Sequence, residues 1–295
     1  MRLPKFISFT SDYGFKVTFG NEKNTLFLKR ALQALIGSSI PITEITFDPT
    51  AFEGVGLDSR SGVYDIACTD EMNNHFIVEM QVSHFKNFMQ RLKFYGFHKF
   101  DTLVEKGKHK YENLSKIYCI AILAHNVTTF KNFRNFGCIK NQDGEIMDDQ
   151  INFVTVELPK FDKTETDCKT DLDKLLFTMK ALSQVKAPIQ YPKFWTEDWI
   201  EVAIKELDVR KLSAKDRMAY IMTLSRNAEA VYTSAENIKN AELKVKVDNI
   251  IQCFKIGLEF SVIAQINQVS LDFVIEINEY AEKNGDDFTN FLSIL

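Results

Sequence analysis

The sequence lacks the features that mark secreted and membrane proteins. Its longest apolar runs fall far short of the length that spans a bilayer, and its first residues include no apolar stretch of the kind found in signal peptides. The five cysteines are odd in number and form no Cys-x-x-Cys pair, which argues against a zinc ribbon and favours reduced, mostly buried thiols. Neither an internal repeat nor a low-complexity tract is present. We therefore expect a cytoplasmic enzyme with no membrane partner.

The sequence also lacks a strong excess of charge of one sign. A net charge of −4 at pH 7 does not by itself suggest a nucleic-acid partner. The distribution is uneven, however, because residues 1–125 carry 15 Lys and Arg against 13 Asp and Glu, and within 82–116 these counts are 8 and 3. A polyanion would be drawn to this basic stretch. A solvated helix face followed by a lysine-rich loop explains it equally well.

Two neighbouring segments carry the polar residues of greatest interest. Residues 62–68 and 75–82 each have the alternating or apolar pattern of a strand, and the polar residues between them indicate a turn. Asp65 lies on the first segment, while Glu79 and Gln81 share one face of the second because they are two residues apart. Carboxylates held close together stay ionised only beside a cation, and Mg²⁺ binds through a few carboxylates plus waters. The alternative is a solvated pair of acids on an edge hairpin.

The rest of the chain alternates helix and strand patterns. At 295 residues, of which 45% are apolar, the chain can bury one large core or two smaller ones. A helix, three strands, a helix and a strand follow one another, which predicts a sheet with helices packed on it. The elements predicted beside the two strands above are helices at 24–36 and 85–104, strands at 42–47 and 115–123, a hairpin at 137–158, and helices at 172–185, 195–207, 214–227 and 235–258.

A charged connector at 162–173 is the best internal boundary in the sequence. We therefore predict one domain at 1–161 and a helical C-terminal region at 162–295. This region ends in a short helix, a turn and a second helix between 261 and 277, which have helix-turn-helix proportions. Two glutamates in the second helix would make a poor surface toward DNA, so a packing or dimerisation element is the favoured interpretation.

Several motifs taken together resemble one protein family. They are Asp12-x-x-Phe15-Lys16, Asp65 with Glu79-x-Gln81, Arg91 with Tyr95, Val156-Glu157-Leu158-Pro159-Lys160-Phe161, and the C-terminal segment Ile263-Ala264…Val269-Ser270…Ile275. This combination is similar to the PD-(D/E)XK nuclease family transposases, also called recombination-promoting nucleases. The likeness covers nearly the whole chain and is strongest from residue 10 to 161.

The resemblance implies both a fold and an activity. The implied fold is α/β, with a restriction-endonuclease-like αβββαβ core, an additional β-hairpin and a helical C-terminal region. The implied activity is that of a DNA endonuclease that depends on Mg²⁺, with Mn²⁺ as an alternative ion. Asp65 and Glu79 would hold the metal, and Gln81 would stand where the wider superfamily has a lysine. A glutamine can orient water but carries no charge, so we expect slower cleavage or a stricter metal dependence.

Five further residues are candidates for supporting roles, and each has a structural alternative. Lys16, Arg60 and Arg91 would contact DNA, although Lys16 could be a surface lysine and Arg60 could solvate a Gly/Ser-rich loop. Arg91 could grip a phosphate with two hydrogen bonds or pair with a carboxylate of the sheet. Asp12 could join the active site or cap a helix, and Tyr95 could join it or belong to the core.

Three classes of function remain open from the sequence. The intact Asp/Glu pair favours a metal-dependent DNA endonuclease that acts in recombination, transposition or defence against mobile elements. The missing lysine favours a DNA-binding accessory protein whose nuclease core has little or no turnover. An interaction module is the third class, in which the acidic helical half dominates. DNA is the expected partner in the first two, and the helix at 235–258 could pair with a second copy to form a homodimer.

Overall fold

The computed structural model describes residues 5–52, 62–82, 87–103, 114–185 and 191–284. The chain divides into two compact units, Met1–Ser225 and Arg226–Leu295. The boundary predicted after residue 161 lies inside the first unit. The reason is packing: helices α4 (Asp171–Ala181) and α5 (Asp198–Glu206), which follow that boundary, both contact α2 (Leu26–Ile36).

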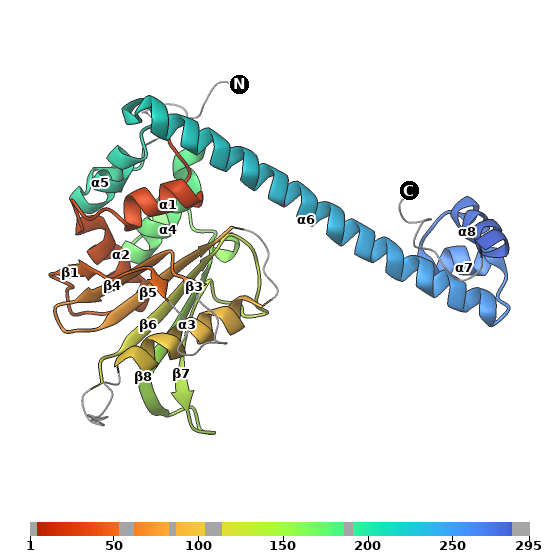
Figure 1. Ribbon diagram of the computed structural model, residues 1–295, viewed down its shortest axis with the longest axis horizontal. Helices are drawn as coiled ribbons and strands as arrows, with labels where there is room; N and C mark the ends of the chain where they lie inside the picture. The colour runs from red at the N-terminus through yellow and green to blue at the C-terminus, as the bar shows by residue number, and fades with distance from the viewer. Residues whose placement is uncertain (1–4, 53–61, 83–86, 104–113, 186–190, 285–295) are drawn as a thin grey trace. The chain divides into compact units, whose positions relative to one another are not determined.

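A mixed sheet of six strands forms the centre of the first unit, which confirms the predicted α/β class (Figure 1). Strands β5, β6 and β8 run parallel to one another, while β1 and β4 on one side and β7 on the other are antiparallel to their neighbours. The spatial order is β1 (Ile45–Phe47), β4 (Ile66–Asp70), β5 (His75–Gln81), β6 (Ile117–Leu123), β8 (Ile146–Glu157) and β7 (Arg134–Lys140). A small ribbon of β2 (Ala51–Phe52) and β3 (Gly62–Val63) precedes β4.

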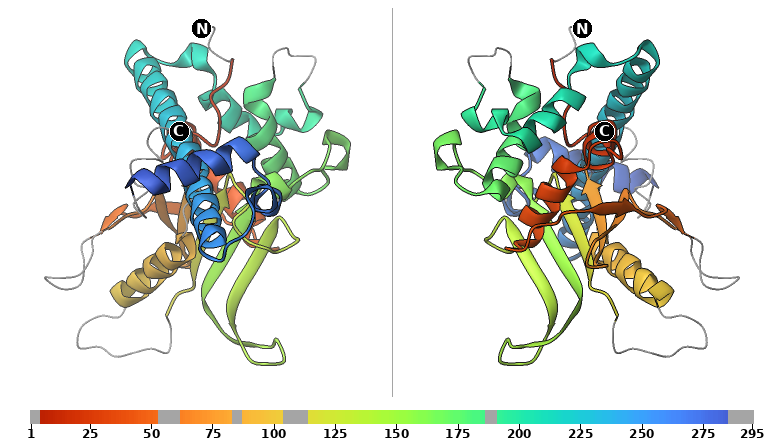
Figure 2. Two further views of the ribbon diagram at one scale, coloured as in Figure 1. Left: turned by 90° about the vertical axis from the view of Figure 1, so that its right-hand side faces the viewer. Right: turned by 90° about the vertical axis from the view of Figure 1, so that its left-hand side faces the viewer.

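Helices cover both faces of this sheet (Figure 1, Figure 2). Helix α3 (Phe88–Leu103) packs on one face, where its apolar residues meet those of β6. Helices α1 (Asp12–Phe19), α2, α4 and α5 pack on the other face around a larger core. Because β6 is buried on both faces, its sequence is an uninterrupted apolar run rather than an alternating one.

The alternation of β5 decides which face its polar residues occupy. Phe76, Val78 and Met80 belong to the larger core, whereas Ile77 packs with the residues of α3. Glu79 and Gln81 lie two and four residues after Ile77 on the strand. Their side chains are therefore on the same face of the sheet as that of Ile77, the face that α3 covers. The predicted strand pair thus places these two side chains under α3.

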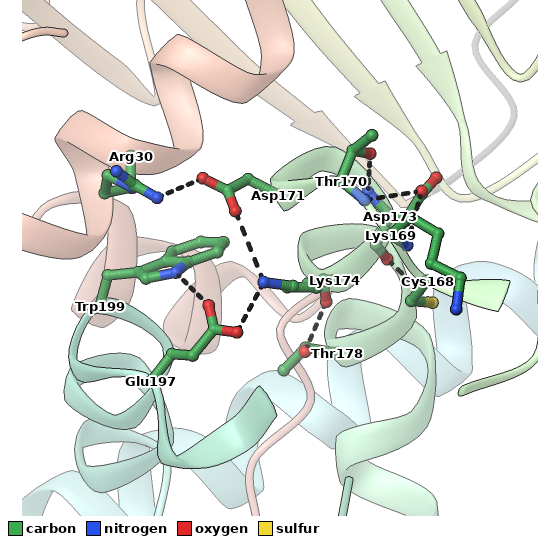
Figure 3. A network of polar contacts seen from close by, with 10 residues as sticks. All are labelled: Arg30, Cys168, Lys169, Thr170, Asp171, Asp173, Lys174, Thr178, Glu197 and Trp199. Atoms are coloured by element: carbon green, nitrogen blue, oxygen red, sulfur yellow. Dashed lines mark hydrogen bonds and ion pairs between the residues drawn. The ribbon is translucent and has the colours of Figure 1, made fainter. Parts of the chain in front are cut away.

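A network of polar contacts joins the helices of the opposite face (Figure 3). Arg30 of α2 pairs with Asp171 of α4, and Lys174 of α4 lies 2.6 Å from an oxygen of Glu197, just before α5. The indole N–H of Trp199 donates to the same Glu197 carboxylate at 3.1 Å. These contacts link α2 with α4 and α5, which lie far from it in the sequence.

The long helix α6 (Ala214–Lys255) corrects one sequence prediction. We predicted two helices at 214–227 and 235–258, whereas the structure has a single helix of 42 residues. The segment that joins the two predicted helices contains neither glycine nor proline, so no residue there ends a helix.

In the second unit, the end of α6 packs with α7 (Phe260–Asn267) and α8 (Leu271–Asn284). The predicted helix, turn and helix are confirmed, and Gln268 supplies the left-handed turn with φ of 53°. Within the described part of the chain, no single helix is long and apolar enough to cross a membrane. Among the described helices, α7 and α8 taken together, across a bend of 115°, meet the length and composition for a span.

Candidate active site

The candidate site lies where β4 begins and β5 ends. Asp65 immediately precedes β4, and the antiparallel register that pairs Ile66 with Val78 brings it beside Glu79. The backbone N–H of Asp65 donates to Glu79 Oε1 at 3.0 Å, and the N–H of Met80 donates to Asp65 Oδ2 at 2.9 Å. Each carboxylate is therefore held by the backbone of the other strand. The predicted approach of the two acids is present, while their role in catalysis stays a prediction.

Both carboxyl groups have raised pKa values. Burial raises the pKa of Glu79 to about 7, and the charge of Asp65 adds to this effect. Burial also raises the pKa of Asp65, although the hydrogen bond from Met80 and the charge of Lys16 oppose it. Near neutral pH, a cation bound beside the pair would favour the form in which both groups are ionised. Burial therefore makes the second negative charge of the pair costly in the absence of a cation.

Arg91 reaches this pair from α3. Its Nη2 lies 3.4 Å from Glu79 Oε2, and the same atom donates a hydrogen bond to Oε1 of Gln81. The structural alternative predicted for Arg91, an ion pair with a carboxylate of the sheet, is thus present. The guanidinium carbon lies 6.0 Å from the centre of the Tyr95 ring, one helical turn further along. Arg91 therefore places a positive charge beside position 81, where this chain has Gln81 instead of a lysine.

Helix α1 contributes charges at the edge of the site. Lys16 Nζ lies 2.8 Å from Asp12 Oδ1, and both side chains are exposed. The charge of Lys16 lowers the pKa of both Asp65 and Glu79, which places it within electrostatic reach of the pair. Asp12 is not the N-cap of α1, because Ser11 accepts the hydrogen bond from the Gly14 N–H at 3.1 Å. Asp12 lies instead in the first helical turn, where a negative charge is favourable.

Tyr95 and Arg60 are the two remaining candidates. Tyr95 is a buried residue of the α3 core, its hydroxyl donates to the Val63 carbonyl at 3.3 Å, and its ring packs edge-on against Tyr64. Its ring centre lies 6.0 Å from the guanidinium carbon of Arg91, and a role for Tyr95 in the active site stays a prediction. Arg60 lies outside the described residues.

The carboxylates of the site supply only part of the ligands that a divalent ion needs. Among the described residues, no group of three or more His, Cys, Asp or Glu side chains is placed to hold a metal. Two carboxylates are nonetheless the usual protein contribution to a Mg²⁺ site, because this ion keeps several waters or substrate oxygens. A hollow of about 10 Å³, about one water molecule in size, adjoins Glu79, Gln81 and Arg91. As oxygen donors, Asp65 and Glu79 suit the chemistry of a partly hydrated ion, although Asp65 does not line this hollow.

Glu157, in the motif that runs from Val156 to Phe161, is a buried acid with a structural role. Glu157 ends β8 and is fully buried, where it accepts hydrogen bonds from the Thr128 N–H at 2.9 Å and the Thr128 hydroxyl at 2.6 Å. Lys160 pairs with the same carboxylate. The motif Val156 to Phe161 thus anchors the loop after β6. Only the proximity of an acid and a lysine three residues apart hinted at this pair in the sequence.

The comparison with known protein families agrees with this architecture of a mixed sheet with paired acids. The model of the PD-(D/E)XK nuclease family transposases matches residues 9–236, and the chain belongs to this family. No curated protein and no solved structure matches the chain. Membership indicates a nuclease- or transposase-related function with DNA as substrate, and nucleases of this kind generally use divalent metals.

Proposed function

We propose that this protein is a metal-dependent DNA endonuclease that hydrolyses phosphodiester bonds. Asp65 and Glu79 are the proposed ligands of a divalent ion, Mg²⁺ or alternatively Mn²⁺. The observation that carries the proposal is the reciprocal pair of hydrogen bonds through which each carboxylate is held by the other strand. The order α2, β1, β4, β5, α3, β6 along the chain supports assignment to the αβββαβ core, with β7 and β8 as the additional hairpin.

The proposed chemistry divides among a few side chains. When bound, the ion polarises a phosphoryl oxygen and lowers the pKa of a water ligand. Asp65 and Glu79 supply two fixed oxygen atoms, while Gln81 has an amide that orients water. Arg91 carries the positive charge that position 81 lacks, and its planar guanidinium suits a phosphate with two hydrogen bonds. Lys16 adds charge at the edge of the site, and together with Arg91 it is a proposed DNA contact.

Cleavage of supercoiled plasmid tests the proposal. We expect nicking with Mg²⁺ that stops when a chelator is added, and a loss of about 10²-fold or more in Asp65→Asn and Glu79→Gln. These variants keep the shape of the side chain and remove only its charge. Glu201→Gln is the matched control, since Glu201 is a half-exposed acid of α5 that pairs with Lys205. Cleavage at the wild-type rate in both site variants would contradict the proposed role of the pair.

A DNA-binding accessory protein with little turnover is the second candidate. The contacts of Arg91 with both Glu79 and Gln81 favour it, because the guanidinium already balances part of the negative charge that would attract an ion. Salt-sensitive binding of DNA without metal-dependent cutting would support this candidate. The absence of both binding and cutting would support an interaction module instead.

A further inference from the structure

A hollow of about 840 Å³ lies between α3 and the hairpin of β7 and β8. Helix α3 contributes Phe97 and Phe100 to it, and the sheet side contributes Phe130, Phe136 and Phe153. A volume of this size is in the range of pockets that hold small organic ligands. The hollow is separate from the small one beside Glu79.

Among the described residues, the aromatic rings of this hollow have no aromatic partners. In the described ranges, none of the five phenylalanines stacks on another ring, although most other aromatic residues of the first unit do so. Phe97 is 58% exposed and Phe136 is 41% exposed, so their faces can accept a planar molecule. Stacking on such faces is sequence-tolerant because every nucleobase has a π-face.

Polar groups also line the hollow. Asn132, Asn135 and Gln150 bring amide groups that can donate and accept hydrogen bonds. The hydroxyl of Thr155 lacks a hydrogen-bond partner although the residue is only 6% exposed. A buried polar group of this kind is costly unless a ligand satisfies it. A ligand with a flat face and polar edges matches this lining better than a purely apolar one.

The register of the sheet places the hollow next to the candidate active site. Glu79 pairs with Ala121, Ala121 with Thr155, and Thr155 with Asn135, so these residues form one row across four strands. Neighbouring strands are about 4.8 Å apart, which puts Thr155 roughly 10 Å from Glu79 along the row. Successive bases of a DNA strand rise about 3.4 Å each. The straight-line separation of the hollow from the carboxylate pair therefore equals the rise of about three nucleotides, although Ala121 between them is buried under α3.

We propose that this hollow binds an unpaired nucleobase of the DNA substrate. The inference rests on the proposed function, because the phosphate of the same strand would lie at Asp65 and Glu79. In paired duplex the faces of a base are covered by its neighbours, so only a flipped, bulged or single-stranded base can enter. The substrate class is thus DNA that carries unpaired bases rather than uniform duplex.

Fluorescence anisotropy with two labelled duplexes tests the inference. One duplex carries a single bulged thymine and the other carries an abasic site at the same position, and both are measured with chelator so that cleavage plays no part. The wild-type protein is expected to bind the thymine bulge roughly 5- to 100-fold more tightly. Phe97→Ala and Phe136→Ala each reduce this preference by a large factor. Phe94→Ala on α3 and Met147→Ala on the hairpin do not line the hollow and keep it.

The outcomes separate this inference from the endonuclease proposal. Equal affinity of the wild-type protein for the two duplexes overturns the base site, as does a preference that survives in both Phe97→Ala and Phe136→Ala. Either result leaves metal-dependent plasmid cleavage unaffected. A preference for thymine that is lost in these two variants, in a protein that never cuts plasmid, supports the base site and rejects the endonuclease.

Discussion

At the scale of single residues, Glu79 is the acid whose environment disfavours its charge. Its pKa is about 7, above its ordinary value of 4.5, because it is buried beside Asp65. Between these two pH values the folded protein binds more protons than the unfolded chain, so the contribution of this group to stability falls as pH rises through that window. Above pH 7 the full cost of its charge is present.

We therefore predict that Glu79→Gln stabilises the metal-free protein at pH 8 but not at pH 4. The expected gain is about 1–3 kcal/mol in the free energy of unfolding, measured by urea denaturation at both pH values. The glutamine oxygen can still accept the Asp65 N–H, so the backbone hydrogen bond is kept. A gain of the same size at pH 4 would show that the charge of Glu79 is not its cause.

Arg91 and Gln81 form the second pair of interest at this scale. If the guanidinium supplies the charge that a lysine at position 81 would carry, Arg91→Ala should slow plasmid nicking by about 10²-fold. The double variant with Gln81→Lys should recover much of the loss, because it returns a positive charge to the same place. A loss of activity in Gln81→Lys alone, with Arg91 present, would instead indicate that Gln81 is a ligand of the metal.

At the scale of elements, α4 begins with a capping box. Thr170 accepts a hydrogen bond from the Asp173 N–H at 3.2 Å, and Asp173 accepts one from the Thr170 N–H at 3.1 Å (Figure 3). This arrangement holds the start of a helix that covers the face of the sheet opposite α3. The capping box is far from the candidate active site in the sequence. The helix that it begins packs in the larger core, on the face of the sheet opposite the site.

We predict that Thr170→Ala lowers the free energy of unfolding by about 1 kcal/mol through loss of this cap. Thr170→Ser keeps the hydroxyl and should stay close to the wild type. Urea denaturation measures the stability of both variants, and plasmid cleavage should be unchanged in each. An equal loss in Thr170→Ser would mean that the methyl group, and not the hydroxyl, is responsible.

At the scale of the whole molecule, the two units have separate cores. The core of the second unit includes Ile250, Ile263 and Val274, and all its members follow residue 246. Among the residues whose side chains the structure describes, the cores of the first unit end at Tyr220. Each unit should therefore unfold in a separate transition, whose temperature depends on the packing of that unit's own core.

We expect calorimetry to resolve two thermal transitions that respond to different substitutions. Ile250→Ala should lower one of them and Leu176→Ala the other, each through a cavity that costs about 2–5 kcal/mol. Val245→Ala, at a site that is 59% exposed, is the control for the second unit. A single transition that moves with both core variants would show that the units unfold together.

Much of the candidate site could be predicted from the sequence because it depends on local patterns. The alternation in β4 and β5 sets their faces and their register, and the register alone brings Asp65 beside Glu79. The approach of Arg91 required more, since it depends on how α3 crosses the sheet. The prediction of two helices in place of α6 was wrong. The amphipathic pattern of this segment is weak, and it was divided at a point where no glycine or proline ends a helix.

The sequence by itself determined the mixed α/β class, the pairing of the two acidic strands and the family. These follow from periodicities of two and 3.6 residues and from short motifs, which need no knowledge of distant contacts. Tertiary structure alone decided that α4 and α5 join the first unit, that Arg91 lies beside position 81, and that five phenylalanines line one hollow. Each of these depends on the packing of segments that are far apart in the chain. The burial of a side chain, and the pKa shift that burial causes, arise only when those segments pack together.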